Sequence, residues 1–299
     1  MEPGERDVRA ETRALRQRVI AERQRAERDA SLADKYEKQF ALAPEPLKPL
    51  SARLRDLHRR VQARHLATAR VIELHATWTE EWHNRADAAA ARPRFVAAVA
   101  SWLGMPSATV TLRGSEHVAA VAAASDPTAR AANELEILMA EGPVTDATAR
   151  GTFIAGAGRS LLDWWPRYGP AAAELGVRAV VAAPLGPPET RIGALCAYGS
   201  EPVIPVGVAI ATDCMAEALT QMILADVWEP GACQDSPAPP VFDEADYRSV
   251  IHQAAGMVSV QFDCGVDVAE DLLAARAFAD GVPVERIAIQ VVCGGLSLR

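Results

Sequence analysis

The side chains with the clearest chemical potential are four histidines that share one predicted helix. His58, His65, His75 and His83 are separated by 7, 10 and 8 residues. A metal ion takes two histidines from one helix at positions i and i+4. We therefore expect surface histidines on a helical arm, and we predict no metal site.

The five cysteines are odd in number and far apart in the sequence. They match neither the even pairing of a disulfide framework nor the CxxC spacing of a metal site. We expect buried or free thiols in a reducing compartment, the cytoplasm. The cysteines are Cys196, Cys214, Cys233, Cys264 and Cys293.

Motifs of catalysis are missing from the sequence. It contains no GxSxG, HExxH or GxxxxGK[ST] pattern. Residues 156–160 (GAGRS) include a GxG, but no second glycine pair completes it, and we predict a loop. Cys196 and His117 could meet an acid in space, yet no local pattern supports a nucleophilic set. We predict that the protein is not an enzyme.

An N-terminal helical arm is predicted over residues 1–85. Apolar residues recur there at gaps of three, four and seven, which is typical of a helix with one apolar stripe. Three prolines within residues 43–49 break the helix, and Ser51 is expected to cap a second one. The pattern indicates an arm or short coiled coil. Its arginine run at residues 53–64 fits a solvated helix face or, alternatively, a contact with nucleic acid.

An α+β domain is predicted over residues 86–229, with an antiparallel sheet and helices on one face. Its strands are short, β-branched or continuously apolar, and turn residues separate them. The predicted strands are residues 107–112, 117–124, 178–185 and 191–200. The predicted helices are residues 94–103, 133–144, 170–177 and 206–229.

A proline-rich linker, residues 230–240, separates this domain from a third module at 241–299. Three short amphipathic helices are expected in the third module, over residues 243–261, over 267–279 and after Pro283. Helices of this length pack as a small bundle.

Charge is divided unevenly among the modules. Residues 1–70 hold 17 basic and 11 acidic side chains, a net of +6, whereas residues 71–240 have a net of −9 and residues 241–299 a net of −5. The sequence shows neither a secretory signal nor an apolar run long enough for a spanning helix. We therefore expect a cytoplasmic protein without membrane contact.

The middle module resembles a GAF domain over most of residues 86–228. The resemblance rests on ELEILMAEGPVTDA, DWWPRYGPAAAELGVRAVVAAPL and RIGALCAYG. It implies a sensory module that binds a small molecule or dimerises, and we expect a homodimer. Trp164, Trp165 and Tyr168 are the candidate ligand-binding residues, with a plain core role as an equal alternative. Signatures for haem, bilin or cyclic nucleotides are lacking, so the cofactor and ligand stay unknown.

The third module resembles an ANTAR domain, the RNA-binding bundle of transcription antiterminators. The matching stretch is residues 250–292, VIHQAAGMVSVQFDCGVDVAEDLLAARAFADGVPVERIAIQVV. A helical arm followed by GAF and ANTAR modules is a common order in that family. The resemblance implies hairpin RNA as a partner. The candidate RNA-binding residues are Arg248, Gln253, Gly256, Arg276 and Arg286.

One departure from the ANTAR pattern concerns charge. Family members carry basic residues where this chain has Ala255, Ala274 and Ala275, and the module holds four arginines against nine acids. Phosphate neutralisation by basic side chains is a large part of RNA affinity. Two functions follow as hypotheses: a GAF-gated regulator that binds hairpin RNA to control antitermination, or an interaction and dimerisation protein that binds no RNA.

Overall fold

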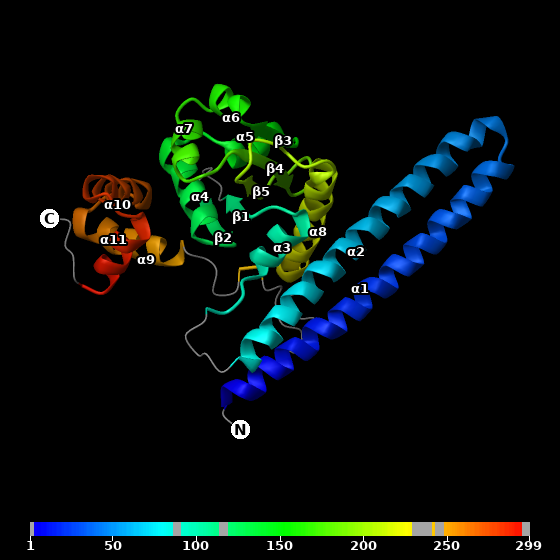
Figure 1. Ribbon diagram of the computed structural model, residues 1–299, viewed down its shortest axis with the longest axis horizontal. Helices are drawn as coiled ribbons and strands as arrows, with labels where there is room; N and C mark the ends of the chain where they lie inside the picture. Colours follow the sequence, from blue (N-terminus) through cyan, green and yellow to red (C-terminus); the bar gives the residue numbers. More distant parts are fainter. Residues whose placement is uncertain (1–2, 86–90, 114–118, 229–240, 243–247, 295–299) are drawn as a thin grey trace.

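The protein has three parts: a long helical hairpin, an α+β domain and a small helical bundle (Figure 1). The computed structural model describes residues 3–85, 91–113, 119–228, 241–242 and 248–294. The predicted α+β class is confirmed, and the five-stranded antiparallel sheet with its helices is consistent with a GAF-like domain.

The hairpin consists of α1 (Pro3–Leu42) and α2 (Lys48–Asn84), joined by the short 3₁₀ helix η1 (Glu45–Leu47). The buried residues of α1 recur at gaps of three, four and seven along one face, which packs on α2. They are Thr12, Leu15, Val19, Glu22, Ala26 and Ala33. The predicted cap at Ser51 is wrong, because α2 already begins at Lys48, where Pro49 fits the first helical turn.

The sheet has the strand order β2-β1-β5-β4-β3, and all its neighbours are antiparallel. The four predicted strands are confirmed. The strands are β1 (Ser107–Arg113), β2 (Ala119–Ala124), β3 (Ile154–Ala157), β4 (Ala179–Leu185) and β5 (Gly193–Gly199). The fifth, β3, includes part of the predicted loop at 156–160, and it is an edge strand too short and too rich in glycine and alanine to show a pattern.

Both faces of the sheet are covered, so the predicted single helical layer is wrong. Val181, Ala183 and Leu195 point into a core with α2, α3 and α8, whereas Val180 and Tyr198 point into a second core. Because β4 and β5 are apolar on both faces, both faces must be buried. The first layer contains α3 (Phe95–Leu103) and α8 (Val208–Trp228). The second contains α4 (Pro127–Met139), α5 (Pro143–Arg150), α6 (Arg159–Trp164) and α7 (Tyr168–Glu174).

The helix predicted at residues 133–144 is two helices. The first, α4, begins earlier because the Asp126 carboxylate accepts hydrogen bonds from the backbone N–H groups of Thr128 and Ala129. It ends at Met139, and Pro143 then opens α5 at its first turn. The Gly142-Pro143 pair therefore follows the end of α4 and also begins α5.

Within the described ranges, one helix is long and apolar enough to cross a membrane by length and composition alone, at Val208–Ala225 in α8. Half of this window is buried inside the structure. The helix packs against α2, α3 and β4, as a core helix does.

The C-terminal bundle contains α9 (Ser249–Phe262), α10 (Val266–Asp280) and α11 (Val284–Val292). Its three helices bury a core of their own, which includes Ile251, Leu273 and Ile287. The three predicted helices are confirmed; the expected start of the first at residue 243 lies outside the described residues. Cys196, Cys214, Cys264 and Cys293 are free thiols, and Cys233 lies outside the described part of the chain.

Candidate functional site

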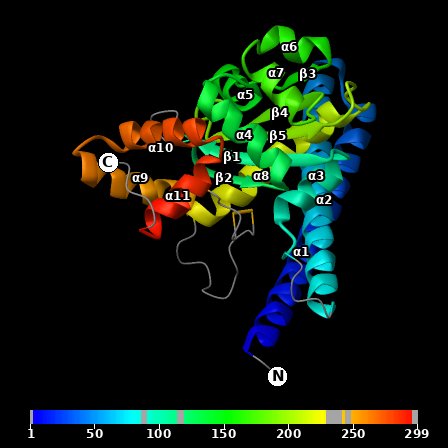
Figure 2. The same ribbon diagram turned by 60° about the vertical axis from the view of Figure 1, so that its left-hand side comes forward.

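A cavity of about 360 Å³ lies where the α+β domain meets the bundle. Figure 2 shows α10 reaching toward α4 and β1 at this junction. The α+β domain supplies the walls from β1, α4 and the start of α5: Thr111, Arg113, Asn133, Glu136, Ile137, Ala140, Val144 and Thr145. The bundle supplies three carboxylates from α10: Asp267, Glu270 and Asp271.

Glu136 is a buried carboxyl group in the cavity wall, only 2% exposed. Its two oxygens accept hydrogen bonds from the backbone N–H groups of Val144 (3.2 Å) and Thr145 (2.6 Å), at the N-terminus of α5. Burial raises the pKa of Glu136 from 4.5 to about 7, and these hydrogen bonds limit the rise. The side chain lies against Gly142, where an added Cβ would be 2.6 Å from the Glu136 Cδ.

The other polar groups of the wall come from β1 and α4. Thr111 donates a hydrogen bond from Oγ1 to Oδ1 of Asn133 at 3.0 Å. Burial lowers the pKa of Arg113, and the charge of Glu136 opposes that change. A desolvated guanidinium and a desolvated carboxyl group thus share one cavity.

The bundle holds its side of the cavity with charged contacts. Glu270 accepts a hydrogen bond from Arg248 at 3.0 Å, and its Oε1 lies 2.8 Å from Nδ1 of His252. Burial favours a higher pKa for Glu270, but its hydrogen bond with His252 and the charge of Arg248 outweigh burial and lower it. An ion pair between Arg130 of α4 and Glu285 of α11 joins the bundle to the α+β domain.

The three predicted ligand-binding aromatic residues do not line this cavity. Trp165 and Tyr168 are buried in the core beneath α6 and α7, and Trp164 is 52% exposed. The indole of Trp165 donates to Asp146 at 3.3 Å. The Tyr168 hydroxyl has no hydrogen-bond partner within the described part of the chain. Trp165 and Tyr168 therefore have the plain core role that the sequence analysis gave as the alternative to ligand binding.

The predicted RNA-binding residues are spread over the bundle. Arg286 and Gln253 are exposed, and Gly256 is partly exposed. Arg276 is also exposed, but its Nε donates to Asp280 at 2.8 Å. The side chain of Arg248 is only 4% exposed and is bound to Glu270, so it faces the junction with the α+β domain.

The histidines of α2 are placed differently from the prediction of surface positions. His58 and His65 lie in the hairpin interface, where Nδ1 of His58 is 2.7 Å from Asp29 and Nδ1 of His65 is 2.5 Å from Glu22. His75 is 3% exposed and packs edge-on against Phe95. The prediction was wrong for these three because α1 and α3 cover the faces that carry them.

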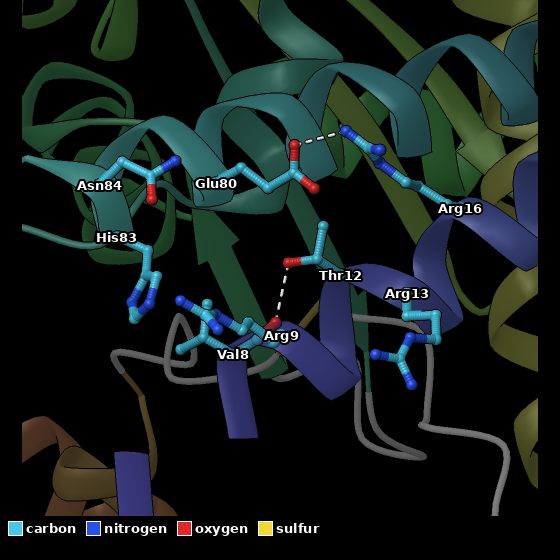
Figure 3. A pocket seen from close by; sticks show the side chains of 8 residues that line it. All are labelled: Val8, Arg9, Thr12, Arg13, Arg16, Glu80, His83 and Asn84. Atoms are coloured by element: carbon cyan, nitrogen blue, oxygen red, sulfur yellow. Dashed lines mark hydrogen bonds and ion pairs between the residues drawn. The ribbon is translucent and has the colours of Figure 1, made fainter. Parts of the chain in front are cut away.

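A second cavity lies between α1 and α2, near the N-terminal end of α1 (Figure 3). It measures about 480 Å³, and Figure 3 shows Arg16 paired with Glu80 across the two helices. Arg9 and Arg13 are exposed along its side. It is a surface groove of the hairpin. The buried hydroxyl of Thr12 in its wall donates a hydrogen bond to the carbonyl oxygen of Val8 at 2.8 Å.

The chain has distant structural neighbours among the solved structures. No family model matches the sequence, and no curated protein matches it. A domain of a protein described as a two-component sensor histidine kinase, from Sinorhizobium meliloti 1021, is 14% identical with a TM-score of 0.36. The match covers 45% of this chain and 88% of that domain. At this identity and score, the neighbour identifies neither a ligand nor a partner.

Proposed function

We propose that the protein is a signal-responsive regulator in which the GAF-like domain controls the C-terminal bundle. A small molecule is the signal, and hairpin RNA is the target of the bundle, in the control of transcription antitermination. The RNA part comes from the resemblance of residues 250–292 to an ANTAR domain. The protein acts as a homodimer in the cytoplasm.

The observation that carries this proposal is the way the bundle meets the GAF-like domain. The bundle has its own core, and it contacts the domain around a cavity and through the Arg130–Glu285 ion pair. Polar contacts of this kind hold modules together weakly, and relative motion is expected across them. A ligand in the cavity would therefore bias where the bundle sits.

Electrophoretic mobility shift with an RNA of two adjacent hairpins tests the RNA part. Arg286 is exposed on α11, and each lost phosphate contact weakens binding and flattens its salt dependence. We expect Arg286→Ala to weaken binding several-fold. Arg150→Ala is the control, because Arg150 forms a surface ion pair with Asp146 on the α+β domain. Failure of the folded wild-type protein to bind at low salt would contradict the RNA target.

A specific observation favours the alternative of an interaction protein without RNA. Two of the module's four arginines are bound to acids of the same bundle, Arg248 to Glu270 and Arg276 to Asp280. Among the described residues of the bundle, Arg286 is then the remaining arginine for contact with phosphates. In this case the bundle contacts another protein, and a steep salt dependence of RNA affinity would count against it.

A further inference from the structure

The cavity between the α+β domain and the bundle has an excess of negative charge. Among the described residues, four carboxyl groups line it, against one guanidinium, that of Arg113. Arg248 and His252 lie beside one of the four, Glu270. The charge of Arg113 acts on Glu136, so the excess is greatest at Asp267 and Asp271. A cleft lined by one sign of charge concentrates ligands of the opposite sign.

The size of the cavity and its apolar walls further limit the class of ligand that it can bind. Ile137, Ala140 and Val144 form an apolar side that suits an aliphatic chain. No aromatic side chain is present among the described residues that line the cavity, so it is not the aromatic cage that binds quaternary ammonium groups. Carboxylates instead favour N–H donors in charge-assisted hydrogen bonds. A volume of about 360 Å³ lies within the roughly 300–1,000 Å³ of small-molecule sites.

We propose that this cavity binds a small aliphatic amine or guanidine, and that the bound cation holds the bundle against the GAF-like domain. The cation bridges Asp267 and Asp271 of α10 to Glu136 of α4. The Glu136 carboxylate is already fixed by two backbone N–H groups of α5, so it needs no rearrangement to receive a cation. The inference rests on the proposed function in one respect: it takes the C-terminal bundle to be the part that the GAF-like domain controls.

Proton exchange accompanies binding under this proposal. Burial raises the pKa of Glu136 to about 7, so near neutral pH the group is partly protonated. A cation favours the carboxylate and lowers that pKa again. Binding near pH 7 should therefore release protons, and affinity should increase as the pH rises from 6 to 8.

Isothermal titration calorimetry of the full chain with putrescine and with agmatine tests the site. We expect both to bind, and choline and succinate to bind at least tenfold more weakly. The double variant Asp267→Asn/Asp271→Asn should weaken putrescine binding about tenfold, because hydrogen bonds to charged groups are lost. Asp280→Asn removes a carboxylate of the same helix that does not line the cavity, and should leave the affinity unchanged.

Hydrogen exchange reports on the docking of the bundle. Putrescine should slow amide exchange in residues 266–273 of the wild type and leave the double variant unaffected. Circular dichroism confirms that the double variant is folded. The proposal is overturned if neither amine binds at millimolar concentration, or if the double variant binds as tightly as Asp280→Asn.

The outcome is separate from that of the RNA experiment. A chain that binds putrescine but no hairpin RNA contradicts only the RNA target. A chain that binds the RNA but neither amine contradicts only the cation site.

Discussion

Glu136 is the residue on which most of the cavity's chemistry depends. It is buried, it is held by the first N–H groups of α5, and it fills the space where Gly142 has no side chain. Nothing in the stretch around Glu136 marks it in the sequence, since a glutamate in a helix with apolar neighbours is an ordinary surface pattern. Its role arises from Gly142-Pro143, which turns α5 back onto α4.

Gly142→Ala tests that close contact. The new methyl group would meet the Glu136 side chain at 2.6 Å, so the carboxylate must leave its two N–H partners. We expect the free energy of unfolding to fall by about 1–3 kcal/mol in chemical denaturation. Gly256→Ala is the matched control: it lies within α9 with no atom close to the added methyl, and should raise stability by about 0.5–1 kcal/mol. Equal effects of the two variants would contradict the expected contact.

Two buried groups should give opposite pH dependence of stability. Glu136 has a pKa of about 7 in the folded protein and 4.5 ordinarily, so its contribution is present below pH 4.5 and is lost as the pH rises to 7. Burial, with the charge of Arg92, lowers the pKa of His75 from 6.5 to about 4, so its contribution is present above pH 6.5 and lost as the pH falls to 4. Each amounts to about 3 kcal/mol.

Urea unfolding between pH 4.5 and 6.5 separates the two. Relative to the wild type, Glu136→Gln should become more stable with increasing pH. Of the two groups, only His75 titrates with a shifted pKa in this variant, and its contribution to stability increases with pH. His75→Leu should become less stable with increasing pH over the same window. Parallel curves for all three proteins would show that neither group has the shifted pKa.

At the level of elements, the helices and strands that depend on local sequence pattern were predicted. The edge strand β3, which depends on hydrogen bonds with a neighbouring strand, was missed. The helix break at the three prolines, the αL end of α3 at Gly104 and four of five strands follow from local chemistry. The edge strand β3 forms because β4 offers it partners, and a glycine-alanine segment carries no signal of that. In the second helical layer, α4 and α7 were predicted as helices, but a local pattern does not show which face of the sheet a helix covers.

The hairpin interface contains two histidine–carboxylate contacts among its apolar layers. His65 and Glu22 are mostly buried, with side chains 16% and 7% exposed. Polar groups inside a two-helix seam favour one register over its alternatives. Glu22 also pairs with Arg25 at 2.5 Å, so it keeps a charged partner when His65 is removed. His65 loses its nearest contact when Glu22 is removed.

A double-mutant cycle on Glu22→Ala and His65→Ala measures that contact. We expect each single variant to lose about 1–3 kcal/mol, and the double variant to lose less than the sum by about 1 kcal/mol or more. The pair Arg23–Glu73, more exposed on the same hairpin, is the control, and its coupling should be at most about 1 kcal/mol. Strict additivity at Glu22 and His65 would contradict a specific contact.

At the scale of the whole molecule, the bundle is the part most easily separated from the rest. It has its own core, and its described contacts with the α+β domain include the Arg130–Glu285 ion pair and the walls of the cavity. The sequence predicted the three helices of this module from their periodicity. The predicted linker, residues 230–240, lies outside the described residues. The cavity could not be predicted, because it joins residues more than 100 positions apart.

Arg130→Ala should loosen the bundle. The substitution breaks the pair with Glu285, and it also removes the partner of the half-buried Glu134. We expect a larger radius of gyration in small-angle X-ray scattering, with the helical content unchanged. Arg159→Ala, which breaks an exposed pair with Asp163 on α6, should leave the radius of gyration as in the wild type. An unchanged radius in Arg130→Ala would show that the ion pair does not hold the bundle.

The hairpin gives the molecule a mechanical property. With 40 residues at about 1.5 Å each, α1 is about 60 Å long, and its turn with α2 lies well away from the sheet (Figure 1). The other end of α2 packs on α3 and α8, next to the sheet. Arg60 of α2 still pairs with Glu217 of α8, so about 12 residues, or about 18 Å, of α2 extend beyond this base. A tilt of about ten degrees there displaces the tip by about 3 Å. The arm is therefore a lever, because a rotation at the core becomes a translation that is largest at the tip of the hairpin.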